Sequence, residues 1–195
     1  MFNYFKKDIG IDLGTANSLL YIKDRGIVIN EPSIAAVNNK TGQIVAIGED
    51  AKKMLGRTPA HISVIKPLVN GVISDFEMTQ EMLRHFLKKV NSNNFFNYYR
   101  AVIGVPPNLT EVEMKSVEDA VINAGASKAY LIEEPVAAAL GARLPIGEAA
   151  ATMIVDIGGG TTDIAVISMN GTVISKSLKI AGDKVNDDIM KFVRD

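Results

Sequence analysis

Cysteine is absent from the 195-residue sequence, so neither disulfides nor thiolate metal sites are available, which fits a reducing cytosol. Neither sign of charge is in excess. The 21 Lys and Arg residues against 22 Asp and Glu residues give a net charge of −1 and no electrostatic case for a nucleic-acid partner. No apolar run approaches the roughly 18 residues that a membrane-spanning helix needs. Lys6, Lys7 and Asp8 interrupt the N-terminus before a signal-peptide core develops. We therefore expect a protein that is soluble or peripheral to a membrane.

Glycine is concentrated in one turn. Residues 156–163 read Asp-Ile-Gly-Gly-Gly-Thr-Thr-Asp, with apolar residues before them at 153–155 and after them at 164–167. The pattern predicts a buried strand, a glycine turn and a second strand that pairs with the first. Glycines let an anion approach the backbone amides, and Thr161 adds a hydroxyl donor, so the turn suits a phosphate. No Gly-Lys-Ser/Thr follows, which excludes a P-loop, and alone the turn would be an ordinary glycine-rich β-turn.

A second copy of this pattern favours the phosphate-binding interpretation. Residues 9–22 read Ile-Gly-Ile-Asp-Leu-Gly-Thr-Ala-Asn-Ser-Leu-Leu-Tyr-Ile and repeat the strand, the Asp, the Gly turn, the Thr and the second strand. A third strand is expected after each copy, at 26–29 and 172–175. A period this long indicates a duplicated domain rather than a solenoid. Two such hairpins facing each other would hold the phosphates of a nucleotide together with Mg²⁺.

The two motifs, Asp12 to Ser18 and Asp156 to Thr162, resemble the phosphate motifs of the actin and heat-shock chaperone ATPase superfamily. One branch is especially similar, the MreB family of bacterial rod shape-determining proteins. Asp163 departs from that branch, where we would expect Glu. The likeness covers essentially the whole chain, and the other similar segments are 26–33, 54–59, 75–76, 103–106 and 131–135.

The resemblance implies an α/β, actin-like fold of two ribonuclease-H-like units. The first unit would be complete and would comprise residues 1–30 and 76–150. Residues 31–75 would form a small inserted subdomain that borders the cleft and contacts the next protomer. The second unit, 151–195, would contain only three strands and the start of a helix at 186–194. We therefore expect a truncated second unit and a fragment of a longer protein.

Local signals predict the boundaries of several elements in the first unit. Apolar residues at helical spacing predict a helix over 76–90. The continuous apolar run at 101–105 predicts a central strand. Thr110 and Glu113 form a capping box that should open a helix reaching about Asn123.

The resemblance also implies which residues bind the nucleotide, ATP or GTP. Asp12 and Asp156 would hold Mg²⁺ through water, because that ion keeps most of its hydration shell. Gly182 and Asp183 resemble the segment that approaches the ribose. The full set of implied nucleotide-binding residues is Gly14, Thr15, Ala16, Asn17, Gly158, Gly159, Gly160, Thr161, Gly182 and Asp183.

Glu134 is the candidate for orienting the water that attacks the nucleotide. Its position before Pro135 favours an extended backbone at a strand–helix junction, aimed into the cleft. The family's catalytic Glu also precedes a Pro, so we prefer Glu134 to Glu133, with Thr161 as a second catalytic candidate. The alternative is that Glu134 only stabilises the N-terminus of the following helix through its dipole.

The resemblance implies a filament-forming cytoskeletal protein that determines rod shape by organising cell-wall synthesis, with slow Mg-dependent ATP hydrolysis coupled to polymerisation. Its partners would be copies of itself, the inner membrane surface and cell-shape and cell-wall synthesis proteins, and it would lie in the cytoplasm at the inner face of the membrane. A chaperone-type ATPase domain and a small-molecule kinase use the same clamp and stay open as alternatives. The 195 residues alone should be inactive, because the adenine-binding segment is missing.

A polar loop at 91–99 carries four aromatic residues, including Phe95 and Phe96. Family members have an apolar membrane-inserting loop in this position, so the two Phe residues are candidates for membrane contact. The alternative is that their rings pack in the protein's own core beside the strand at 101–105.

Overall fold

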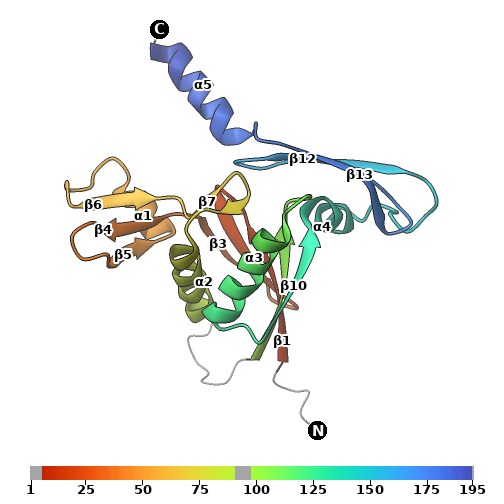
Figure 1. Cartoon of the computed structure of the whole chain (residues 1–195), viewed down its shortest axis with the longest axis horizontal. Coiled ribbons are helices and arrows are strands. Elements are labelled where there is room, and N and C mark those ends of the chain that lie inside the picture. The colour runs from red at the N-terminus through yellow and green to blue at the C-terminus, as the bar shows by residue number, and fades with distance from the viewer. Residues whose placement is uncertain (1–5, 91–97, 195) are drawn as a thin grey trace.

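The computed structural model describes residues 6–90 and 98–194, and its largest element is a five-stranded mixed sheet (Figure 1). The first three strands form an antiparallel meander, and β1 also pairs in parallel with β9, which pairs in parallel with β10. The carboxyl ends of β1, β9 and β10 therefore meet at one edge of the sheet. In spatial order the strands are β10 (Lys128–Glu133), β9 (Tyr98–Val105), β1 (Lys6–Leu13), β2 (Asn17–Ile22) and β3 (Gly26–Pro32).

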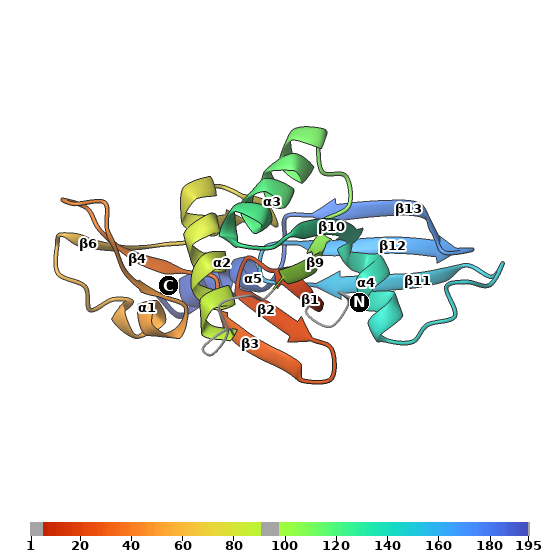
Figure 2. The ribbon, with the colours of Figure 1, turned by 90° about the horizontal axis from the view of Figure 1, so that it is seen from below.

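Helices α2 (Phe76–Val90) and α3 (Glu111–Ala124) pack together beside this sheet (Figure 2). Apolar side chains of both helices, among them Phe86 and Val121, join the sheet in the main hydrophobic core. The predicted bounds of α2 and the predicted capping box of α3 are confirmed: Thr110 Oγ1 accepts a bond from the Glu113 amide at 3.2 Å, and Glu113 Oε2 accepts one from the Thr110 amide at 2.8 Å. No helix within the described ranges is long and apolar enough to cross a bilayer.

Residues between β3 and α2 build a smaller sheet of order β5-β4-β6 and a two-stranded ribbon. Helix α1 packs on the small sheet, around the buried side chain of Ala51. The bounds are β4 (Ala35–Asn38), β5 (Ile44–Ile47), α1 (Glu49–Met54), β6 (Ile62–Ile65), β7 (Leu68–Val69) and β8 (Val72–Ile73).

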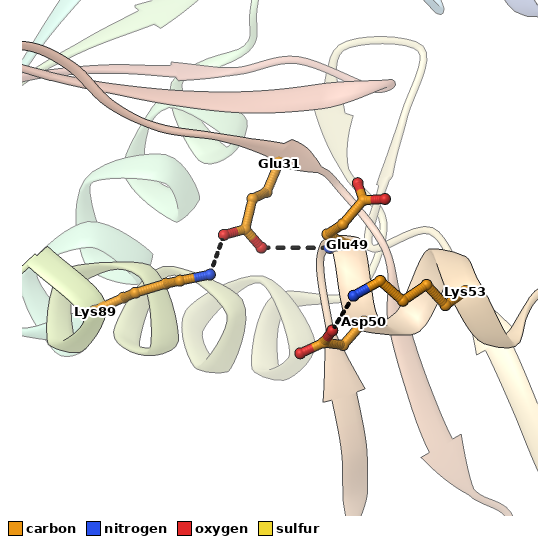
Figure 3. Close-up of polar contacts among 5 residues, drawn as sticks. All are labelled: Glu31, Glu49, Asp50, Lys53 and Lys89. Atoms are coloured by element: carbon orange, nitrogen blue, oxygen red, sulfur yellow. Dashed lines mark hydrogen bonds and ion pairs between the residues drawn. The ribbon is translucent and has the colours of Figure 1, made fainter.

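One carboxylate, that of Glu31, attaches the small sheet to the large one (Figure 3). It accepts a bond from Lys89 Nζ at the end of α2 and another, at 3.3 Å, from the Glu49 amide at the start of α1. A Cβ at Gly48 would lie 2.1 Å from Glu31 Oε2, and Gly48 has a φ of +65°. Only glycine fits this position without strain, so Gly48 makes room for the carboxylate.

A separate antiparallel sheet contains β11 (Thr152–Ile157), β12 (Thr162–Ser168) and β13 (Gly171–Leu178). Helix α4 (Glu134–Gly141) follows β10 directly but packs in a second core with β12, where Ala139 meets Ile167. Helix α5 (Gly182–Arg194) has no buried residue and extends away from the five-stranded sheet and from the β11–β13 sheet (Figure 1).

Two boundaries differ from the sequence interpretation. Tyr99 was placed in the polar loop, but it is buried in β9, because that strand pairs with β1 as far as Tyr98, which lies opposite Lys6. The last helix begins at residue 182 rather than 186, and the Val185 amide already donates to the Ala181 carbonyl. Phe95 and Phe96, the residues expected to contact a membrane, lie outside the described residues.

Candidate functional site

The two glycine hairpins face each other across one cavity of about 920 Å³. The first hairpin joins β1 to β2, and the second joins β11 to β12, so the duplicated sequence motif becomes two walls of one site. Most of the expected site residues line this cavity: Asp12, Gly14, Thr15, Ala16, Asn17, Glu134, Asp156, Gly158, Gly159, Gly160 and Thr161.

Buried serines hold the first hairpin in shape. Ser33 Oγ donates to the Gly14 carbonyl at 2.6 Å and is hydrogen-bonded to Ser18 Oγ at 2.8 Å. The Ser33 amide also donates to the Ala16 carbonyl at 3.0 Å. Both serines are fully buried. Sequence reasoning missed Ser33, because only the pairing of β2 with β3 brings it beneath the turn.

The start of α5 holds the second hairpin. The amides of Gly182 and Asp183 donate to the carbonyls of Gly158 and Gly159 at 3.2 and 2.9 Å. The Asp183 carboxylate forms an ion pair with Lys66 at 2.6 Å. Gly182 and Asp183 do not line the cavity, so in this chain they support the glycine turn from outside.

The two hairpins touch each other and the β7–β8 turn. A Cβ at Gly159 would lie 2.6 Å from the Ala16 Cβ, and one at Gly160 would lie 2.6 Å from Thr15 Oγ1. Thr15 Oγ1 in turn accepts a bond from the Gly71 amide at 3.0 Å. Sequence reasoning missed this turn, although Asn-Gly between the apolar pairs 68–69 and 72–73 is a recognised hairpin signal.

Four carboxyl groups gather around the cavity, those of Asp12, Glu134, Asp156 and Asp163. Burial, followed by repulsion from the other three carboxylates, raises the pKa of Glu134 to about 8. Burial also raises the pKa of Asp12, with a further contribution from Asp156, and it raises that of Asp156, with a contribution from Asp163. Asp12 is open to the cavity yet surrounded by protein atoms, which explains its partial desolvation. No Lys, Arg or His among the described residues lines the cavity, so the site carries negative charge that this part of the chain leaves uncompensated.

The side chain of Glu134 passes over a bare position in the sheet. A Cβ at Gly104 would lie 3.3 Å from Glu134 Cγ, closer than ordinary contact. Gly104 pairs with Asp12 on one side and with Ile132 on the other, so it lies between β1, which carries Asp12, and β10, which leads into Glu134 at the start of α4. The glycine gives Glu134 a path into the cavity.

The acidic residues suit a hydrated divalent cation rather than one bound directly. Among the described residues, no three His, Cys, Asp or Glu side chains are grouped closely enough to hold a metal by themselves. Asp163 is almost fully buried, and its Oδ1 has no hydrogen-bond partner within the described part of the chain. Uncompensated carboxylates on two walls of an open cavity fit Mg²⁺, which binds through one or two carboxylates and keeps several waters.

Two β-meanders that close glycine turns on one cavity define an actin-like fold. The structure of a MamK double helical filament has the same fold, with a TM-score of 0.78 at 24% identity over 96% of this chain and 58% of that one. The chain belongs to the MreB/Mbl protein family, whose profile matches residues 6–195.

Curated relatives can be aligned with nearly the whole of this chain. The cell shape-determining proteins Mbl of Bacillus subtilis and MreB of Escherichia coli are each 50% identical over 97% of this chain, covering 57% and 56% of their own lengths. MreB5 of Spiroplasma citri, solved with ADP and with AMPPNP, superposes with a TM-score of 0.89 at 40% identity, over 97% of this chain and 56% and 57% of those chains. The chain thus spans little more than half the length of these relatives.

Proposed function

We propose that the full-length protein is an ATP-binding, filament-forming protein that helps to determine rod cell shape. The observation that carries the proposal is the cavity between two Asp-tipped glycine hairpins, in a family whose member MreB5 was solved with ADP and AMPPNP. The double helical filament of MamK, which shares the fold, supports self-association. We propose three subdomains: the first comprises residues 1–30 together with 76–150, the second residues 31–75, and the third residues 151–195.

Each wall of the cavity has a proposed role. The amides at Gly14 to Asn17 and at Gly159 to Thr161 donate to β- and γ-phosphate oxygens from opposite sides, whereas the Gly158 amide donates to the Thr161 carbonyl within the turn at 2.9 Å. Asp12 and Asp156 would hold Mg²⁺ through its water ligands, and the ion would neutralise part of the phosphate charge. Glu134 accepts a hydrogen bond from the attacking water and aligns it with the γ-phosphate. Thr161 is the second candidate for this alignment.

Two experiments test the filament proposal and the nucleotide site: sedimentation of the full-length protein, and replacement of Asp156 by Ala. The full-length protein should sediment as filaments with Mg-ATP, whereas a chaperone or a kinase would stay in the supernatant. Asp156→Ala should reduce the gain in ATP affinity that Mg²⁺ gives by about ten- to hundredfold, the scale for losing one charge-assisted hydrogen bond. Calorimetric titration with and without Mg²⁺ measures this. Asp119→Ala, on the surface of α3, is the control and should bind normally. Equal Mg²⁺ dependence in both variants would refute the metal assignment.

We further propose that Phe95 and Phe96 attach filaments to the inner face of the membrane, near the proteins of cell-wall synthesis. Burying one Phe yields about 1.5–3 kcal/mol, which is marginal for one protomer but sufficient when a filament repeats the loop. In the full-length protein, Phe95→Ser with Phe96→Ser should abolish co-sedimentation with liposomes and leave polymerisation unchanged. A melting temperature several degrees lower would instead indicate that the two rings belong to the core.

A further inference from the structure

Glu133, the neighbour of Glu134, has its carboxylate committed to the second sheet. Glu133 Oε2 accepts a hydrogen bond from Thr172 Oγ1 at 2.7 Å, in a partly buried setting between β10 and β13. The two residues are 39 positions apart in the sequence. Glu133 does not line the cavity, whereas Glu134 does. The two adjacent acids therefore point to different surroundings, and of the two it is Glu134 that faces the cavity.

The junction that Glu133 occupies determines where Glu134 points. Glu133 is the last residue of β10, where it pairs with Val105, and it is also the residue before α4, with an extended backbone at φ −62° and ψ 131°. Among the residues that the structure describes, no side chain caps the N-terminus of α4. A small rotation at this junction would move the Glu134 carboxylate, which lies among like charges that repel it. Pairing with β9 fixes the strand side of this junction, but the helix side needs a further contact.

The contact on the helix side comes from the β11–β13 sheet, on which α4 packs. Thr172 pairs with Ile167 of β12, and Ile167 is fully buried in the core that it shares with Ala139 of α4. The Thr172 hydroxyl and the packing partner of α4 are thus on neighbouring strands. The hydrogen bond to Glu133 fixes the first turn of α4 to the sheet that also receives the body of the helix.

We propose that Glu133 is a positioning residue, which acts through its hydrogen bond with Thr172 to hold Glu134 in line with the attacking water. This role rests on the proposed ATP hydrolysis and deepens it. The rate of hydrolysis would then depend partly on the Glu133–Thr172 hydrogen bond, which joins the five-stranded sheet to the β11–β13 sheet.

Steady-state hydrolysis by the full-length protein tests the proposal. Thr172→Val keeps the shape of the side chain and removes the donor, and it should lower kcat about tenfold while leaving KM unchanged, because misplacing a catalytic group costs rate rather than binding. Thr172→Ser restores the hydroxyl, and Glu133→Gln keeps an acceptor oxygen, so each should recover most of the rate. Glu133→Ala should match Thr172→Val, and the double variant should be no slower than either, because both remove the same bond.

The controls separate this proposal from the assignment of Glu134. If Thr172→Val hydrolyses ATP at the wild-type rate while Glu134→Ala does not, the positioning role is wrong and the proposed function stands. If Glu134→Ala also hydrolyses normally, the catalytic assignment itself fails. Additive losses in the double variant, or a raised KM with unchanged kcat, would overturn the positioning role. Should Thr172→Val lower the melting temperature, the Thr172→Ser and Glu133→Gln variants decide, because both keep the bond and should stay fast.

Discussion

Glu134→Ala in the full-length protein should slow ATP hydrolysis by about 10²-fold or more and leave ATP affinity nearly unchanged. The size is that expected for the loss of a side chain that orients the attacking water. Binding should survive because the hairpin amides, and not Glu134, are the proposed phosphate ligands. Single-turnover hydrolysis and calorimetric titration measure the two quantities separately. A variant that hydrolyses ATP normally would move the role to Thr161.

A second measurement on the same side chain uses its pKa of about 8, against an ordinary value of 4.5. A raised pKa means that the folded, nucleotide-free chain holds this proton more tightly than the unfolded chain. The stabilisation is complete below about pH 4.5 and disappears as the pH rises through about 8. Glu134→Gln keeps the neutral shape at every pH. Its melting temperature should therefore fall less than that of the wild type between about pH 5 and 8, and parallel curves would show that Glu134 is not buried among like charges.

The parts of the site that could be predicted from the sequence are those written in adjacent residues. Asp156 lies near the end of β11, just before the turn of three glycines, and Asp12 lies in the same way before Gly14, so each half of the clamp is a local pattern. Glu134 was found because Pro135 fixes the junction beside it. The actin-like fold was implied by the resemblance of the two glycine motifs to those of a known superfamily, and the structural relatives confirm it.

The parts that could not be predicted depend on chain segments that meet only in the folded protein. Ser33 reaches Gly14 through strand pairing, and Lys66 reaches Asp183 across 117 positions. Neither pair has a sequence signal of its own. Tyr99 was misplaced for a related reason: the asparagine-rich flank suggests a turn, but the parallel pairing with β1 extends the strand.

Gly159→Ala should weaken nucleotide binding by the full-length protein by about 10²-fold. A Cβ at this position would lie 2.6 Å from the Ala16 Cβ and 3.2 Å from the Ala16 amide nitrogen. Neither atom belongs to a flexible side chain, so the two glycine turns would have to move apart. Overpacking of this kind costs about 1–3 kcal/mol, and here the strain falls on the two walls that bind the phosphates. Calorimetric titration with Mg-ATP measures the loss.

A compensating change at Ala16 shows whether the cause is the contact between the hairpins. Ala16→Gly removes the 2.6 Å clash and leaves the closest remaining approach, 3.2 Å, to the backbone. The double variant with Gly159→Ala should therefore recover most of the lost affinity, although not all of it. Gly171→Ala is the matched control, because its Cβ would have no neighbour nearer than 3.7 Å, and it should bind like the wild type. If Ala16→Gly fails to rescue Gly159→Ala, the two hairpins do not meet in the nucleotide-binding state, and the clamp closes through the nucleotide alone.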